Sequence, residues 1–155
     1  MTAAVRLSAA AGSLLLAAAV AGPASAAAVQ ACNDYAMATY LAEPWEANSR
    51  TFYDGRVRVA VVDTDGEPAC CSAWLVVIFP DPSDELGGRT CRMVGQGEGS
   101  GFMGVDVKGI RSTYDPARGL GLSVPVRTMA DDGASAAPAT VRLRLDLKAG
   151  TLRVE

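Results

Sequence analysis

The stretch Ala-Trp-Leu-Val-Val-Ile-Phe, residues 73 to 79, decides the fold of this chain, because it is apolar on both of its alternating faces. Cys70-Cys71-Ser72 precedes it and Pro80-Asp81-Pro82 follows it. An apolar run this short, ended by proline and rich in β-branched and aromatic residues, is typical of a strand. Full burial of such side chains is worth about 1.5–3 kcal/mol each. We therefore predict a central strand that is covered on both faces.

The first 26 residues have the pattern of a secretory signal peptide. Arg6 is their one charged residue, Leu7 to Ala21 is apolar, and Ala24-Ser25-Ala26 follows a Gly-Pro break. This order predicts cleavage after Ala26 and export to the periplasm or the medium. The remaining residues, 27–155, are expected to form a single exported domain.

Two alternatives to a cleaved signal peptide concern the membrane. The apolar segment is about 15 residues long, whereas a spanning helix needs about 20, which disfavours a membrane anchor. Cys32 follows a small residue, Ala31, as in lipidated cysteines, but it lies far beyond the apolar run and Gln30 fits poorly. We therefore expect no membrane span in the mature chain.

Composition excludes several classes of function. The chain has no histidine, which rules out Ser-His-Asp triads, Cys-His dyads and imidazole metal ligands. Its formal net charge is −3, and no run of lysine or arginine appears, which argues against nucleic-acid binding. The sequence favours a protein that is not an enzyme, with no cofactor, and it sets no oligomeric state.

Short alternating segments predict an all-β fold. We expect strands at 57–62, 73–79, 89–95, 102–108, 110–114, 120–126, 141–147 and 152–154. Six or more such strands and no convincing helix indicate a single antiparallel β-sandwich or partly open barrel of roughly 7–9 short strands. Residues 27–50 fit a first strand or a short helix equally well. Pro125 cannot donate a ladder hydrogen bond, so its strand should lie at an edge or pair on one side only there.

Two hairpins are predicted around the segment 89–95. If it folds back on 73–79, opposite residues sum to about 168 and Cys91 faces Val77. If the glycine-rich turn 96–101 then leads into a second hairpin with 102–108, Met93 lies opposite Met103. The core face would then consist of Cys91, Met93, Met103, Val105 and Val107.

Four cysteines in an exported chain suggest two disulfides. On the first hairpin, Cys70 and Cys71 lie about 20 Å from Cys91, and a bridge needs Cα atoms within about 7 Å. Cys32 is therefore the predicted partner of Cys91. Cys70 and Cys71 are left either as a vicinal disulfide or as free thiols on opposite faces, and one of them could pair with Cys32 if the hairpin is wrong.

Motifs that suggest ligands fail their context tests. Gly99 to Gly104 matches the dinucleotide pattern G-x-G-x-x-G, but an alternating segment follows it where a helix is required. Asp63-Thr64-Asp65-Gly66 lacks the glycine position and the final glutamate of a calcium loop. Met93, Met103 and Cys91 are better explained as core than as a copper site. The sequence thus predicts no metal site and singles out no catalytic residue.

Aromatic residues gather early in the mature chain: Tyr35, Tyr40, Trp45, Phe52 and Tyr53. Such a cluster can stack on sugar rings or form a hot spot for a protein partner, and it can also close one end of a sandwich. The first functional hypothesis is a non-enzymatic exported domain that binds an envelope protein or polysaccharide through this region. The alternative is an exported thiol or disulfide redox protein that uses Cys70 and Cys71. A hydrolase based on paired carboxylates is a third hypothesis, kept because the absence of a motif is weak evidence, although the sequence singles out no pair of acids.

Overall fold

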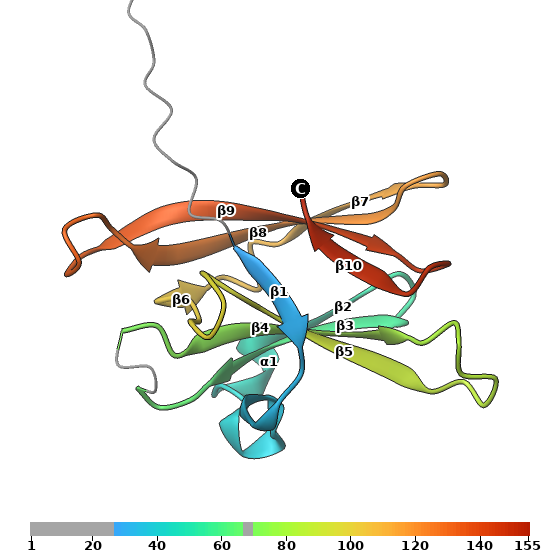
Figure 1. Cartoon of the computed structure of the whole chain (residues 1–155), viewed down its shortest axis with the longest axis horizontal. Coiled ribbons are helices and arrows are strands. Elements are labelled where there is room, and N and C mark those ends of the chain that lie inside the picture. The colour runs from blue at the N-terminus through green and yellow to red at the C-terminus, as the bar shows by residue number, and fades with distance from the viewer. Residues whose placement is uncertain (1–26, 67–69) are drawn as a thin grey trace, which may run out of the picture.

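The computed structural model describes residues 27–66 and 70–155, and in this part the protein is all-β with two antiparallel sheets (Figure 1). The predicted signal peptide lies outside the described residues. The first sheet has the order β1-β5-β4-β3-β2, with strands β1 (Ala28–Ala31), β2 (Ser49–Phe52), β3 (Val57–Asp63), β4 (Ala73–Pro80) and β5 (Arg89–Gly95).

The second sheet has the order β10-β9-β8-β6, and β7 also pairs with β8. Its strands are β6 (Gly104–Val105), β7 (Arg111–Asp115), β8 (Gly119–Met129), β9 (Ala136–Asp146) and β10 (Thr151–Val154). The described residues therefore form ten strands, more than the seven to nine predicted. The difference arises because short strands such as β1, β2 and β6 carry little alternation of their own.

The prediction of a central strand at 73–79 is confirmed. β4 lies in the middle of the first sheet, between β3 and β5. Its hairpin with β5 also forms, but the register differs by one residue from the predicted one, because Cys91 lies opposite Ile78 and not Val77. A change of a single residue in the connecting loop is enough to shift the register in this way.

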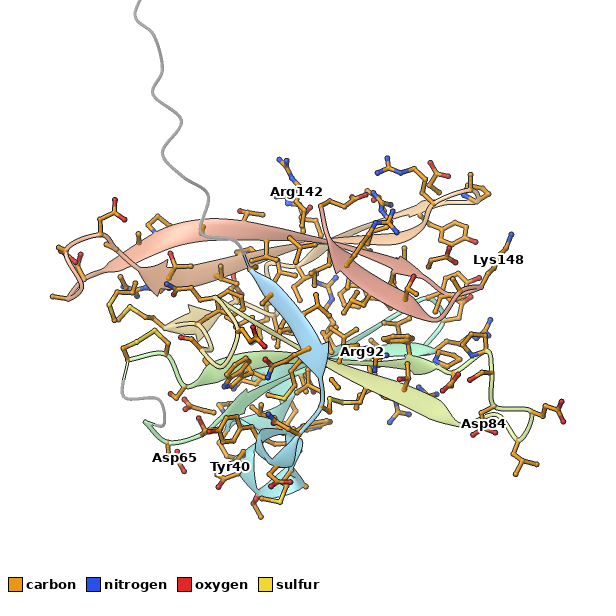
Figure 2. All side chains as sticks on the ribbon, viewed as in Figure 1. Tyr40, Asp65, Asp84, Arg92, Arg142 and Lys148 are labelled. Carbon is orange, nitrogen blue, oxygen red and sulfur yellow. A yellow bond between two sulfur atoms is a disulfide. The ribbon has the colours of Figure 1, made fainter. Side chains whose placement is uncertain are left out.

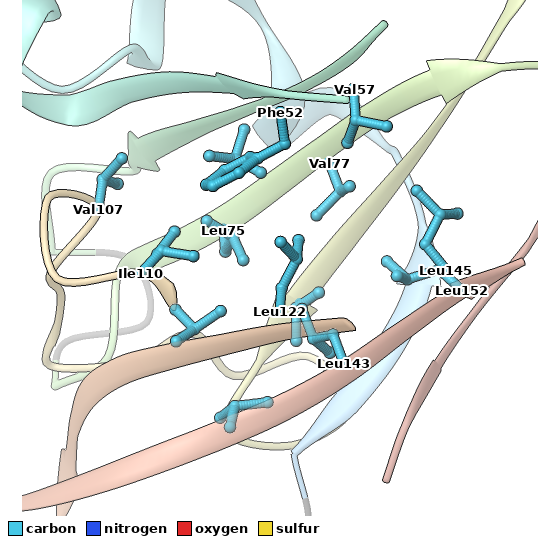
Figure 3. Close-up of a cluster of buried hydrophobic side chains, with 14 of the residues drawn as sticks. Phe52, Val57, Leu75, Val77, Val107, Ile110, Leu122, Leu143, Leu145 and Leu152 are labelled. Carbon is cyan, nitrogen blue, oxygen red and sulfur yellow. The ribbon is translucent and has the colours of Figure 1, made fainter. Parts of the chain in front are cut away.

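The main hydrophobic core lies between the two sheets (Figure 3). Leu75 and Val77 project into it from β4, and Leu122 and Leu143 project into it from β8 and β9. A second cluster lies on the outer side of the first sheet and contains Val62, Trp74, Val76 and Met93. These two clusters explain why β4 is apolar on both faces.

The segment 32–48 covers part of this outer cluster. It consists of two 3-10 turns, η1 (Asp34–Ala36) and η2 (Ala38–Tyr40), and one short helix, α1 (Trp45–Asn48). The sequence leaves strand and short helix open for residues 27–50, and the structure contains both, because β1 precedes these turns. The Asn33 side chain caps η1 by accepting the N–H of Tyr35.

The predicted second hairpin, between 89–95 and 102–108, is wrong. β5 pairs with β4 and β1, whereas β6 pairs with β8 in the other sheet. The turn 96–101 does form, and Phe102 then bridges to Ala73 before the chain crosses to the second sheet. The predicted core face is correct for Val107, which lies in the main core, and for Val105, which packs against it. It is wrong for Met93 and Cys91, which belong to the outer cluster, while Val94 faces the main core.

The later strands agree with the sequence. The strands predicted at 110–114 and 120–126 form as β7 and β8, which pair as a hairpin, and β9 presents Val141, Leu143 and Leu145 to the core. Pro125 lies in β8, which is an internal strand, at the place where pairing changes from β7 to β6. There its carbonyl accepts the N–H of Asp106. In residues 27–66 and 70–155, no helix is long and apolar enough to cross a membrane.

Candidate functional site

The five aromatic residues predicted as a binding face are divided among different parts of the molecule. Tyr35 packs on Trp74, with ring centroids 6.1 Å apart, and Tyr40 joins the same outer cluster. Phe52 is only 7% exposed and belongs to the main core. Tyr53 stacks on Tyr114 with centroids 5.3 Å apart. Trp45 alone of the five is strongly exposed, at 49%.

Trp45 lines a groove on the outer side of the first sheet, which we call the outer groove. Its volume is about 510 Å³, within the range of sites for small molecules or peptide side chains. The floor is aliphatic and consists of Ala60 and Val62 from β3 with Val76 and Ile78 from β4. Leu41 and Trp45 contribute to its walls.

Strand alternation and register explain the floor of the outer groove. Ala60 pairs with Val76 and Arg58 pairs with Ile78, so their side chains share the outer face. The segment before α1 is held at its start by the disulfide between Cys32 and Cys91. At its end, Leu41 bridges Val62 and the N–H of Ala42 donates to Val61. Ala60, Val62 and Val76 are buried, whereas Ile78 at the far end of the floor is partly exposed.

Backbone and side-chain hydrogen bonds hold Trp45 in place. The amide N–H groups of Ala47 and Asn48 both donate to the carbonyl of Pro44, which closes the single turn of α1. The hydroxyl of Ser49 donates to the carbonyl of Trp45 at 2.9 Å. The indole is therefore carried by an anchored turn, although its own ring is half exposed.

The outer groove has one cation available for a ligand among the described residues that line it. Arg50 donates to the carbonyls of Lys108 and Ile110, and its guanidinium lies 4.8 Å from the Phe52 ring. Arg58 is exposed and has no hydrogen bond or ion pair within the described ranges. Ser49 and Thr51 add hydroxyl groups to the lining.

The cysteines form two bonds. Cys32 is joined to Cys91 with a Cα–Cα distance of 5.6 Å, which agrees with the pairing predicted from the β4–β5 hairpin. Cys70 is joined to Cys71, whose Cα atoms are 3.8 Å apart, so the vicinal arrangement is the one present. Cys71 is 1% exposed, whereas Cys70 is exposed. Neither of these two residues lines the outer groove or the larger cavity beside the β8–β9 hairpin.

The carboxylates show no arrangement typical of a hydrolase in residues 27–66 and 70–155. Where a carboxyl pKa is shifted, it is lowered, because turn hydroxyl and amide groups or arginines stabilise the anion. For Asp132 the hydroxyl and N–H of Ser135 and the N–H of Ala134 lower the pKa to about 2. A general acid needs the opposite shift. Within these ranges no group of three Cys, Asp or Glu residues gathers where it could hold a metal ion.

A larger cavity, of about 620 Å³, lies beside the β8–β9 hairpin. Phe102 and Val141 line it, as does Gln96, whose side-chain oxygen accepts the N–H of Met129. Ala27 also lines it, so one boundary of this cavity adjoins residues outside the described part. The outer groove is therefore the better defined candidate site.

Sequence reasoning found Trp45 but missed the rest of the outer groove. The floor residues belong to strands whose outer faces have the pattern of core, and the register of β3 on β4 brings these residues to one face, where a groove remains beside Trp45. Comparison with known proteins adds nothing to this site, since no family model, curated protein or solved structure matches the chain.

Proposed function

We propose that the protein is an exported, non-enzymatic binding domain that holds a segment of an envelope protein in the outer groove. In this proposal residues 1–26 are a cleaved signal peptide and residues 27–155 form a single antiparallel β-sandwich in the periplasm or the medium. The two stacked sheets and their shared core support the sandwich assignment. The proposal concerns the mature chain alone.

The observation that carries this proposal is the half-exposed indole of Trp45 beside an aliphatic groove whose floor is partly exposed at Ile78. Aromatic anchors next to desolvated pockets are typical of binding hot spots. The floor of Ala60, Val62, Val76 and Ile78 favours aliphatic or aromatic side chains over the hydroxyl-rich faces of sugars. Arg58 at the same groove favours an acidic residue beside them. The ligand is thus an extended peptide segment with apolar side chains and a neighbouring carboxylate.

A selection from a displayed random-peptide library tests this function. The mature protein should enrich peptides in which apolar residues adjoin Asp or Glu. Trp45→Ala should weaken their binding about tenfold or more, since loss of a hot spot costs about 2 kcal/mol. Arg58→Gln should weaken the acidic peptides selectively.

The matched control is Leu86→Ala, because Leu86 is 98% exposed and apolar but lies in the loop after β4, away from the outer groove. This variant should bind as the wild type does. Peptides that bind Trp45→Ala with unchanged affinity would contradict the assignment of the groove. Binding of neutral oligosaccharides that depends on Trp45 would instead favour the polysaccharide as the envelope ligand.

A second candidate, an exported thiol–disulfide redox protein, is favoured by the bond between exposed Cys70 and buried Cys71. In such a protein, a dithiol donates two electrons and two protons, the bond opens to two thiols, and the dithiol becomes a disulfide. Alkylation and mass measurement across a series of thiol buffers test this. The redox function predicts reversible opening of Cys70–Cys71 while Cys32–Cys91 stays closed, and a bond that resists all of these buffers contradicts it.

A further inference from the structure

Arginine side chains gather on the outer face of the second sheet. Leu120, Leu122, Leu143 and Leu145 point into the main core, so the residues that alternate with them point away from it. These outward residues include five arginines, which we call the arginine face: Arg111, Arg127, Arg142, Arg144 and Arg153.

The strand register brings these arginines together from four strands. Arg153 pairs with Arg144, and Ser123 lies between Arg142 on one side and Arg111 on the other. Because neighbouring strands are about 5 Å apart, the backbones of Arg142 and Arg111 are about 10 Å apart across Ser123. Arg127 lies on the same face of β8, four residues beyond Ser123.

Four of these arginines have their charge available. Arg111, Arg127, Arg142 and Arg153 are exposed. Within residues 27–66 and 70–155, none of their guanidinium groups takes part in a hydrogen bond or an ion pair. Figure 2 shows Arg142 projecting outward from β9, away from the space between the sheets.

The acidic residues of this face are already engaged. Asp115 and Asp146 lie at one end of it, Glu155 lies beside Arg142, whose carbonyl accepts its N–H, and Asp106, which lies near Arg127, accepts the N–H of Gly109. Asp115 accepts the N–H groups of Ala117 and Arg118, and Asp146 accepts those of Lys148 and Ala149. Glu155 pairs with Arg118 and Arg144. The chain as a whole has a net charge of −3, so a face with four free arginines represents a separation of charge within the molecule.

The fifth arginine, Arg144, is buried, and its guanidinium lies next to Gly121 and Thr113. A Cβ atom on Gly121 would lie 2.9 Å from its Nη1 and 2.8 Å from the hydroxyl of Thr113. Arg144 is 8% exposed, and its Nε has no hydrogen-bond partner in the described chain. Glu155 pairs with Nη2 of Arg144 at 2.8 Å, so the charge that this face offers to a ligand comes from the four exposed arginines.

The other groups on the face narrow the choice of ligand. Ser123, Thr113 and Thr140 present hydroxyls beside the arginines. The exposed large apolar residues of the described chain are Met37, Trp45, Leu86 and Tyr114, and Tyr114 pairs with the inward-facing Leu120. The face thus lacks aromatic rings on which bases could stack and apolar side chains that could enter a bilayer.

We propose that the arginine face binds a linear acidic polysaccharide, whose carboxylates pair with the exposed arginines that the β7–β8–β9–β10 register sets on both sides of Ser123. The sugar hydroxyls bond to the serine and threonine side chains. This interaction is independent of the outer groove, because the groove lies on the opposite side of the molecule, where Figure 2 labels Tyr40.

Affinity electrophoresis and calorimetry of the full mature protein test the proposal, with polygalacturonate as the acidic probe and dextran as the neutral one. Polygalacturonate should bind and dextran should not, and the affinity should fall as salt is raised from about 50 mM, because the exposed charges are screened. Arg111→Gln/Arg142→Gln should weaken binding about tenfold or more. Exposed substitutions of this kind leave stability nearly unchanged, which thermal melting checks.

The charge-matched control is Arg56→Gln/Arg58→Gln, which removes two exposed arginines from the first sheet and its β2–β3 turn, including the groove arginine. This variant should bind polygalacturonate as the wild type does, even if peptide binding fails. An equal loss in both double variants overturns the assignment to the arginine face, as does absence of binding at about 50 mM salt. Equal or tighter binding of duplex DNA or of anionic vesicles through Arg111 and Arg142 overturns the choice of polysaccharide.

Discussion

Gly101 lies just before the point where the chain crosses from the first sheet to the second. Its carbonyl accepts the N–H of Gln96, and the next residue, Phe102, exchanges hydrogen bonds with Ala73. Phe102 is then buried in the main core, and β6 follows in the second sheet. The backbone at Gly101 must therefore approach the start of β4 closely, which only a residue without a side chain permits.

Gly101→Ala should lower the free energy of unfolding by about 1–3 kcal/mol, the usual cost of forcing an extra methyl group into a packed site. The new Cβ would lie 2.5 Å from the carbonyl oxygen of Cys71 and 2.7 Å from that of Ala73, and neither backbone group can move freely. Urea denaturation measures the change. Gly97→Ala is the control, since nothing lies within 4 Å of its Cβ position, and an equal loss in both variants contradicts this account.

Glu155 gives the molecule a pH dependence at acid pH. Hydrogen bonds from Arg144 and then from Arg118 lower its pKa from 4.5 to about 2. A carboxyl with a lowered pKa stabilises the folded state above its unfolded pKa, and this contribution is lost as pH falls from about 4.5 towards about 2. Glu155→Gln should therefore lose less stability on acidification than the wild type.

Urea denaturation at neutral pH and near pH 2 checks the effect of Glu155. Asp132 is the natural comparison, because the hydroxyl and N–H of Ser135 also lower its pKa to about 2. Asp132→Asn should still lose, on acidification, the part of the free energy of unfolding that is due to Glu155. It should not show the further loss that is due to Asp132. If Glu155→Gln loses as much stability in acid as the wild type, the ion pairs with Arg118 and Arg144 do not contribute to folding.

At the scale of elements, the disulfide Cys32–Cys91 joins the short edge strand β1 to its neighbour β5. β1 has four residues and pairs only with β5, from Ala28 opposite Gly95 to Ala31 opposite Arg92. Cys32 follows directly, so the bond holds both β1 and the start of the segment that walls the outer groove. Its two cysteines are separated by 59 positions in sequence.

Cys32→Ala/Cys91→Ala should lower the free energy of unfolding by about 4 kcal/mol, the value for a loop of this length in the chain-entropy model. The matched control is Cys70→Ala/Cys71→Ala, because a bond between neighbours closes no loop and should contribute much less. Denaturant unfolding of both double variants, under oxidising conditions, measures the difference. A similar loss in the two would show that chain entropy is not the source of stabilisation.

Elements were predictable from sequence where their own residues decided them. The continuous apolar run of β4 and the alternation of β9 indicate their burial directly. The β4–β5 hairpin was correct because a short polar loop joins two strands that are each clear in the sequence. The partner of β5 on its other side was not predictable, since a glycine-rich turn marks a change of direction but not the strand that is reached. β1 lacked a signal of its own because two alanines flank its Val-Gln core.

The candidate sites were harder to predict than the strands, because they depend on which segments become neighbours and not on the residues of one segment. Trp45 stood out as an aromatic residue, but its groove depends on how far the segment 32–48 extends over β3 and β4. The exposed arginines of the arginine face are far apart in the sequence, so they form no basic run that would indicate a common site: Arg111, Arg127, Arg142 and Arg153. They form one face only through the registers of β7, β8, β9 and β10, and a slip of one residue would turn a strand's arginines inward.

At the scale of the whole molecule, the two outer faces differ in character. The outer side of the first sheet carries the short helical segment α1 and the aliphatic outer groove, and the outer side of the second carries exposed arginines such as Arg142 (Figures 1 and 2). Between them, one core cluster draws on both sheets, from Phe52 and Leu75 on one side to Leu122 and Leu143 on the other. Neither sheet can bury this surface alone, so the two should unfold together.

Leu143→Ala tests this coupling, because Leu143 belongs to the second sheet and is 1% exposed. Truncation of a buried leucine costs about 2–5 kcal/mol. The reporter is Trp74 in the first sheet, which lies in the outer cluster and not in the main core. Trp45→Phe leaves Trp74 as the single tryptophan of the chain. In that background, Leu143→Ala should move the urea midpoint of Trp74 fluorescence as far as that of circular dichroism. A Trp74 transition that stays in place would mean that the first sheet holds its structure without the second.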